Sequence, residues 1–225
     1  MPDRIAVLAA VADLIILRRR PGVLRVGIDG VDGSGKSVLG DEFASTLRAR
    51  GLTVVRASVD GFHRPVSERY RRGRRSPHGY YEDSFDYGAL HRELLDPLGA
   101  NGSRLCRTAV YDVARECAAD VTPTAVPDGS VLVLDGIFVH RPELRDVWDL
   151  SLFVRVPFEV SVPRGAGRGY GHPDPEHPSN SRYVEGQRHY LALCDPESRA
   201  DVVLDNTDLA RPFIVEAHRP LDGGR

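Results

Sequence analysis

Short apolar runs recur along the chain and are separated by longer segments with helical spacing. After the first run, Leu39, Phe43 and Leu47 follow at four-residue spacing and Gly51 provides a stop signal, which predicts a helix with one apolar face. Strands that alternate with helices predict an α/β fold with a mostly parallel sheet and helices on both faces. Five runs have the length of a buried strand: residues 23–28, 53–57, 131–134, 150–156 and 201–204.

The first 21 residues predict a helix that packs on the domain. Ile5, Leu8, Ala12 and Ile15 recur at helical spacing. The run is too short to span a bilayer, acidic residues interrupt it, and three arginines follow it, an order of charges that does not suit a signal peptide. We therefore expect no membrane partner.

One segment matches a phosphate-binding motif at every fixed position. Residues 30–37 read Gly-Val-Asp-Gly-Ser-Gly-Lys-Ser, which fits G-x-x-x-x-G-K-[S/T] between a predicted strand and a predicted helix. The glycines let successive N–H groups turn inward toward an anion, the lysine reaches the β- and γ-phosphates, and the last serine offers a hydroxyl to Mg²⁺. The motif predicts that ATP and Mg²⁺ are cofactors. The expected contacts are Gly30, Gly33, Ser34, Gly35, Lys36 and Ser37.

Lys36 is the only lysine among the 30 lysine and arginine residues of the chain. Arginine replaces lysine wherever only a surface cation is needed, but its broad, planar fork does not replace a slim ammonium between two phosphates. A single lysine also excludes a Ras-type GTPase, which reads guanine through a second lysine. Lys36 is therefore expected to be a catalytic residue.

Two aspartates follow predicted strands and are candidates for the chemistry of phosphoryl transfer. Asp135 ends the run at 131–134, where its carboxylate would face the phosphate-binding loop and, with Ser37, order Mg²⁺. Asp60 follows the run at 53–57 and would lie near the γ-phosphate, able to accept a proton from an attacking hydroxyl. The pair Asp60-Gly61 also suits an ordinary turn.

The composition of the chain limits the kinds of molecule that it is expected to bind and the cellular compartment in which it is expected. A net charge of −2 and a pI near 6.4 argue against a dedicated nucleic-acid binder and favour a small anion held at one site as the partner. Three cysteines without metal-ligand spacing suit neither a disulfide framework nor a zinc site and favour a reducing cytoplasm. A homo-oligomer is left open.

A length of 225 residues suits one domain over 1–225, with a lid-like insertion at 163–182. The glycines and prolines of this insertion prevent it from forming one continuous helix. Arg164 and Arg168 are four residues apart and could reach the transferred phosphoryl group when a lid closes, or they could only meet solvent.

The arginines at 69–75 likewise suit either a solvated loop or a contact with substrate.

Together these motifs resemble the uridine kinase and phosphoribulokinase-like group of P-loop kinases, from about residue 26 to about residue 208. Besides the loop, the similarity rests on Asp60-Gly61-Phe62-His63, Phe85-Asp86, Tyr111-Asp112 and Leu134-Asp135-Gly136. The resemblance implies a P-loop NTPase three-layer sandwich with a flexible lid, and an ATP-dependent kinase that acts on a small acceptor such as a nucleoside.

By that resemblance Asp60 is the catalytic base, and His63 lies with it in the acceptor site. Asp86 would hold the hydroxyls of a ribose-like acceptor, and Tyr111 would line its pocket. Glu116 stands where uridine kinases usually carry a histidine that contacts the base. Other acceptors, namely pantothenate, a sugar or a nucleoside monophosphate, and a non-catalytic ATP-dependent switch therefore stay open.

Overall fold

A six-stranded sheet forms the centre of the molecule in the computed structural model, which describes residues 3–217. The strand order is β10-β9-β8-β1-β7-β2; five strands run parallel, and β10 is antiparallel to β9. The mostly parallel α/β sheet is as predicted. The strands are β1 (Leu24–Gly30), β2 (Val54–Ser58), β7 (Val131–Gly136), β8 (Leu150–Arg155), β9 (Val202–Asp205) and β10 (Phe213–Ala217).

Eight α-helices within the described part of the chain surround the sheet, with short turns and two small ribbons. The helices are α1 (Arg4–Leu17), α2 (Lys36–Ala49), α3 (Val66–Arg69), α4 (Pro77–Asp83), α5 (Tyr87–Leu90), α6 (Phe158–Ala166), α7 (Ser181–Cys194) and α8 (Pro196–Arg199). The turns are η1 (Val59–Phe62), η2 (His91–Leu95) and η3 (Pro178–Asn180). The ribbons pair β3 (Leu105–Cys106) with β6 (Thr124–Ala125), and β4 (Tyr111–Asp112) with β5 (Cys117–Ala118).

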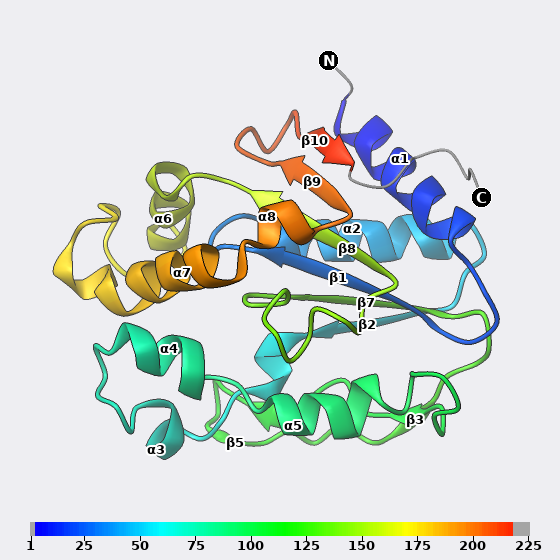
Figure 1. Cartoon of the computed structure of the whole chain (residues 1–225), viewed down its shortest axis with the longest axis horizontal. Helices are drawn as coiled ribbons and strands as arrows, with labels where there is room; N and C mark the ends of the chain where they lie inside the picture. Colours follow the sequence, from blue (N-terminus) through cyan, green and yellow to red (C-terminus); the bar gives the residue numbers. More distant parts are fainter. Residues whose placement is uncertain (1–2, 218–225) are drawn as a thin grey trace.

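Alternation along the strands divides the core into two apolar layers. In β7, Val131 and Val133 pack toward α1 and α2, whereas Leu132 and Leu134 pack toward the layer that contains α4, α5 and α7. Figure 1 shows α1 and α2 on one side of the sheet and α5 with the β3 ribbon on the other. These are the three layers of the predicted sandwich.

The parallel register brings the ends of β1, β7 and β2 to one edge of the sheet. Asp135 lies opposite Ile28 of β1 and Ser58 of β2. The phosphate-binding loop, Asp135 and η1 therefore follow neighbouring strands at their carboxyl ends, where ligands bind in open α/β sheets. In Figure 1, α6 and α7 lie beyond the same end of β1.

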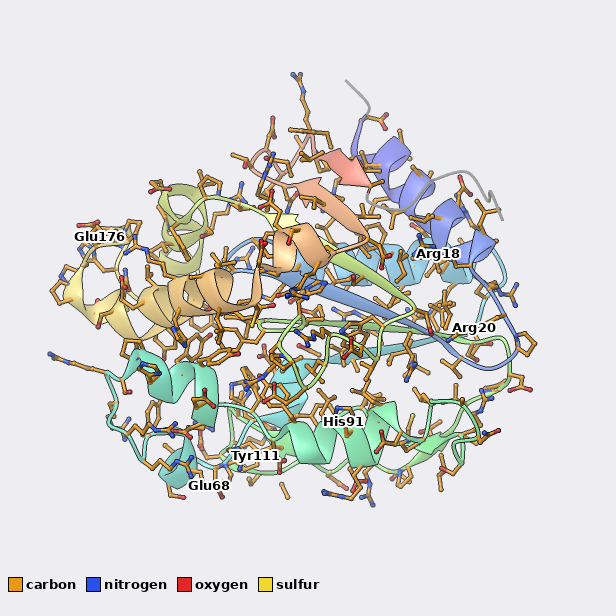
Figure 2. All side chains as sticks on the ribbon, viewed as in Figure 1. Arg18, Arg20, Glu68, His91, Tyr111 and Glu176 are labelled. Carbon is orange, nitrogen blue, oxygen red and sulfur yellow. The ribbon has the colours of Figure 1, made fainter. Side chains whose placement is uncertain are left out.

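The segment predicted as a lid is not one continuous helix. After α6 ends at Ala166, residues 167–177 are not helical, and α7 begins at Ser181. Glu176 lies at the outer end of this segment (Figure 2) and accepts a hydrogen bond from Arg188 of α7. The glycines and prolines of the segment account for the break.

Two sequence-based expectations need correction. The predicted apolar face of the first helix is wrong at its start, because Ile5 is 75% exposed while Val7, Val11 and Leu14 are buried with Ala12 and Ile15. Strand β10 was not predicted, because it is an edge strand with exposed apolar side chains and an irregular register between Ile214 and Glu216.

Residues 1–2 and 218–225, which the single-domain prediction includes, lie outside the described residues. Within residues 3–217, each helix is too short or too polar to cross a membrane.

The face of α1 can be tested with two equivalent substitutions on the same helix. Ile15→Ala should lower the free energy of unfolding by about 2–5 kcal/mol, because Ile15 is fully buried. Ile5→Ala should change it by less than about 0.5 kcal/mol, because that side chain is exposed. Urea unfolding measures both, and equal losses would contradict this packing.

Candidate functional site

The phosphate-binding loop requires glycine at two positions for reasons that the structure makes explicit. Gly33 and Gly35 have φ angles of +76° and +89°, which side-chain-bearing residues rarely adopt. A Cβ atom on Gly33 would lie 2.1 Å from the Ser161 carbonyl oxygen, and one on Gly35 would lie 2.6 Å from Asn206 Nδ2. The loop is thus packed closely between α6 and the end of β9, and α2 begins directly after it at Lys36.

Lys36 lies at the start of α2 and points back over the loop. Its Nζ donates to the Val31 carbonyl oxygen at 3.3 Å and is 3.8 Å from Asp32 Oδ1. Asp32 Oδ2 in turn accepts from Tyr80 Oη at 2.8 Å and from Gln187 Nε2 at 3.2 Å. Helices α4 and α7 therefore hold the acid that pairs with the only lysine.

Ser37 and Asp135, the pair predicted to bind a metal, lie together. Ser37 Oγ donates to Asp135 Oδ2 at 2.5 Å, and Asp135 is only 1% exposed. A hydroxyl and a carboxylate next to a phosphate-binding loop are the hard oxygen ligands that Mg²⁺ prefers. The residues present therefore fit the metal. Arg56 Nη2 lies 2.7 Å from Asp135 Oδ1, a contact that was not predicted.

Asp60 lies in η1, the turn that directly follows β2. Burial among protein atoms raises the pKa of this carboxyl, with Asp32 and Asp135 adding to the rise and His63 and Lys36 opposing it, although the side chain keeps contact with solvent. The rise brings the pKa of Asp60 closer to the pKa of an efficient general base.

The other predicted acceptor residues surround η1. Asp86 N donates to the Phe62 carbonyl oxygen at 2.8 Å, and the His63 ring packs against Phe85 at 4.5 Å. On the opposite side of the turn, Val110, the residue before Tyr111, donates its N–H to the Gly61 carbonyl oxygen at 2.8 Å. The fold thus brings together the three backbone segments that carry Asp60 and His63, Asp86, and Tyr111.

Gly61 and Asp86 also have structural roles here. A Cβ on Gly61 would lie 2.7 Å from Ala109 Cβ, so glycine allows the two segments to meet. Asp86 Oδ1 caps α5 by accepting from Ala89 N at 2.9 Å.

Glu116 joins Tyr111 to the α3 segment. Tyr111 Oη donates to Glu116 Oε2 at 3.0 Å, and Arg69 Nη2 lies 2.5 Å from Oε1. The hydrogen bond from Arg69 lowers the pKa of Glu116. Figure 2 shows Tyr111 near the α3 end of the molecule, far from Arg18 and Arg20. Both carboxylate oxygens of Glu116 are therefore engaged by the protein.

Much of the arginine run at 69–75 pairs with acids of the protein. Arg71 and Arg72 lie 2.6 and 2.9 Å from the two oxygens of Asp83, which is 1% exposed. With Arg69 on Glu116, these side chains anchor the segment between α3 and α4 to the domain.

Arg164 of the predicted lid binds the segment after β9. Arg164 donates to the carbonyl oxygens of Asn206 and Thr207 at 3.1 and 2.6 Å, and Arg168 is exposed. The Asn206 side chain supports the loop itself, since its Nδ2 donates to the Ser34 carbonyl oxygen at 2.7 Å. A role for Arg164 or Arg168 in catalysis stays a prediction that requires the lid to rearrange.

A buried polar network at the end of β1, also unpredicted, fixes the start of the loop. Asp29 Oδ1 accepts from Gly30 N at 2.7 Å, while Oδ2 accepts from His140 Nδ1 at 2.7 Å and from Tyr190 Oη. His140 and Tyr190 are 111 and 161 residues away from Asp29 along the chain, so no local spacing reveals them.

Comparisons with known proteins agree with this geometry. No family model matches the chain. It is 24% identical to human nicotinamide riboside kinase 1 over 151 residues (66% of this chain, 67% of that protein). It is also 24% identical to the uridine kinase of Ligilactobacillus salivarius over 140 residues (62% and 63%). A Bacillus stearothermophilus structure described as a possible uridine kinase superposes with a TM-score of 0.69 at 23% identity, covering 87% of this chain and 96% of that one.

The strand order and the loop after β1 define a P-loop kinase fold. Within that class, the similarity to a nicotinamide riboside kinase and to a uridine kinase supports the resemblance to uridine kinase-like P-loop kinases that the motifs predicted.

The Asp29 network should contribute to stability through its charged acceptor. Tyr190→Phe should lower the free energy of unfolding by about 1.5–3 kcal/mol, because it removes a hydrogen bond to a buried carboxylate. Tyr81→Phe is the matched control, since Tyr81 Oη meets only the Cys194 sulfur at 3.5 Å. Its loss should stay below about 1 kcal/mol. Equal losses in chemical denaturation would show that the network adds nothing.

Proposed function

We propose that this protein is an ATP-dependent kinase that phosphorylates a hydroxyl of a small, nucleoside-like acceptor. The observation that carries the proposal is that the loop with Lys36 and the turn with Asp60 directly follow β1 and β2, the two strands that flank β7. One residue suits the phosphates and the other suits the attacking hydroxyl, at the same edge of the sheet.

The nucleotide half of the site is formed by the loop after β1. Its N–H groups and the start of α2 would bind the phosphates, and Lys36, which pairs with Asp32 in this structure, would contact the β- and γ-phosphates. Ser37 and Asp135 would hold Mg²⁺, which neutralises developing charge on the phosphate oxygens when bound.

The transfer step needs one proton acceptor on the protein. The acceptor hydroxyl gives its proton to the Asp60 carboxylate while its oxygen bonds to the γ-phosphorus, and the bond from that phosphorus to the β,γ-bridging oxygen breaks. ADP leaves with the electron pair of the broken bond. Arg164 or Arg168 would balance charge if the lid at 163–182 closes.

The acceptor half of the site is assigned to the residues around η1. Asp86 has one oxygen on Ala89 N and would offer the other to ribose hydroxyls, and His63 and Tyr111 lie in segments that contact η1. The relatives are kinases of nicotinamide riboside and of uridine, both ribosides, and this supports a nucleoside rather than pantothenate or a free sugar.

The three free cysteines, Cys106, Cys117 and Cys194, support a cytoplasmic location. A homo-oligomer and the absence of nucleic-acid and membrane partners stay predictions from the sequence.

ATP consumption in the presence of single acceptors tests the proposal. We expect a riboside such as uridine or nicotinamide riboside to stimulate ADP formation and to yield a phosphorylated product, with pantothenate, free sugars and uridine monophosphate inactive. A slow ATPase whose rate no acceptor changes would instead indicate a nucleotide-dependent switch.

Lys36→Arg should lower kcat/KM for ATP by about 10²-fold or more, because the planar fork does not fit between the phosphates. Lys36→Ala should abolish activity. The matched control is Arg48→Lys, the reverse exchange on the same helix, which should leave kcat/KM within about twofold. Near-normal turnover by Lys36→Arg would show that the site does not require lysine at position 36.

Asp60→Asn should lower kcat by about 10²-fold or more while ATP binding stays nearly intact. In the natural protein, kcat/KM for the acceptor should fall as the pH drops through the raised pKa of Asp60, because only the ionised base accepts a proton. That acidic limb should be missing in Asp60→Asn and present in Asp13→Asn, a control at an exposed acid of α1. Full activity of Asp60→Asn would exclude it as the base.

A further inference from the structure

An arginine on β2 contacts the predicted metal site. Arg56 Nη2 lies 2.7 Å from Asp135 Oδ1 and donates to the Ser37 carbonyl oxygen at 3.1 Å. Its Nε donates to Asp41 Oδ1 of α2 at 2.8 Å. One guanidinium therefore contacts both residues that are assigned to the metal.

Helix α2 leaves space for this side chain at one position. A Cβ atom on Gly40 would lie 2.7 Å from Arg56 Nη2 and 2.9 Å from Cζ. Glycine inside a helix costs about 1 kcal/mol relative to alanine, so its presence in the middle of α2 has a reason in packing. A side chain at position 40 would force the Arg56 guanidinium to shift from its present position.

The contacts divide the Asp135 carboxylate between two partners. Oδ1 faces Arg56, and Oδ2 accepts from Ser37 Oγ at 2.5 Å. Because the carboxylate is 1% exposed, solvent screens this ion pair little, and the positive charge of Arg56 cancels most of the field that a free cation would feel. A divalent cation alone is therefore attracted to Asp135 less strongly than it would be without Arg56.

We propose that Arg56 is a positioning residue that holds Asp135 against Ser37 and neutralises it, so that the divalent cation binds together with the nucleoside triphosphate and not before it. This inference rests on the proposed function, because it uses the assignment of Mg²⁺ to Ser37 and Asp135. A purely structural arginine would link β2 to α2 without affecting metal binding.

Binding of Mn²⁺, measured by electron paramagnetic resonance without nucleotide or acceptor, separates the two roles. Arg56→Met keeps an apolar side chain of similar length but removes the charge. We expect Mn²⁺ to bind the variant about tenfold or more tightly than the natural protein, because Asp135 regains its full charge. A structural role alone predicts no gain in affinity.

Gly40→Ala perturbs the same contact without changing any charge. The added methyl group should push Arg56 away from Asp135, so this variant should also bind Mn²⁺ more tightly. It decides the question alone if Arg56→Met does not fold. The matched control is Arg48→Met, because Arg48 donates to the β2 backbone at Val54 but is not paired with a carboxylate at the metal site.

Tighter Mn²⁺ binding in Arg56→Met and Gly40→Ala, with no change in Arg48→Met, supports the inference. Unchanged or weaker binding in Arg56→Met, or an equal gain in Arg48→Met, overturns it. A parallel titration with ATP tests the underlying assignment separately. If the natural protein binds no Mn²⁺ even with ATP, the assignment of the metal to Ser37 and Asp135 is wrong. If it binds Mn²⁺ with ATP but the variants show no change in Mn²⁺ affinity, only the role of Arg56 is wrong.

Discussion

The loop between β1 and α2 has a conformation that side chains from distant segments must hold in place. Positive φ angles at Gly33 and Gly35 leave the loop without a regular structure of its own. The Asp29 carboxylate accepts a hydrogen bond from Gly30 N, the first N–H of the loop. Gln187 Oε1 accepts from Asp32 N, and Asn206 Nδ2 donates to the Ser34 carbonyl oxygen. The strands, α7 and the end of β9 thus converge on one anion-binding loop.

The parallel sheet then decides which side chains share that edge. Because β7 lies between β1 and β2, the acid that ends β7 and the turn after β2 both come next to the loop. The loop that carries Lys36 follows β1 and the turn that carries Asp60 follows β2, so the sheet brings both to the edge where we propose that the active site lies. Arg56 and Lys36 pair with Asp135 and Asp32, two of the carboxylates at this edge of the sheet.

The features that sequence reasoning predicted depend on local patterns. Apolar runs located five strands, and the loop motif located Lys36 and Ser37 because its spacing is fixed. The contacts of Arg56 and Gln187 depend on packing between segments far apart in the chain, which no local pattern records. The face of α1 was misjudged near Ile5, since a uniformly apolar helix gives weak evidence for the side that is buried.

The central claim is that Lys36 and Asp60 act from two sides on the same phosphoryl group. A crystal structure with a non-hydrolysable ATP analogue and a riboside tests it most directly. We expect Lys36 Nζ on the β- and γ-phosphates and the acceptor hydroxyl oxygen within about 2.6–3.2 Å of the Asp60 carboxylate. An acceptor hydroxyl beyond reach of Asp60, with the phosphates held by Lys36, would contradict the claim.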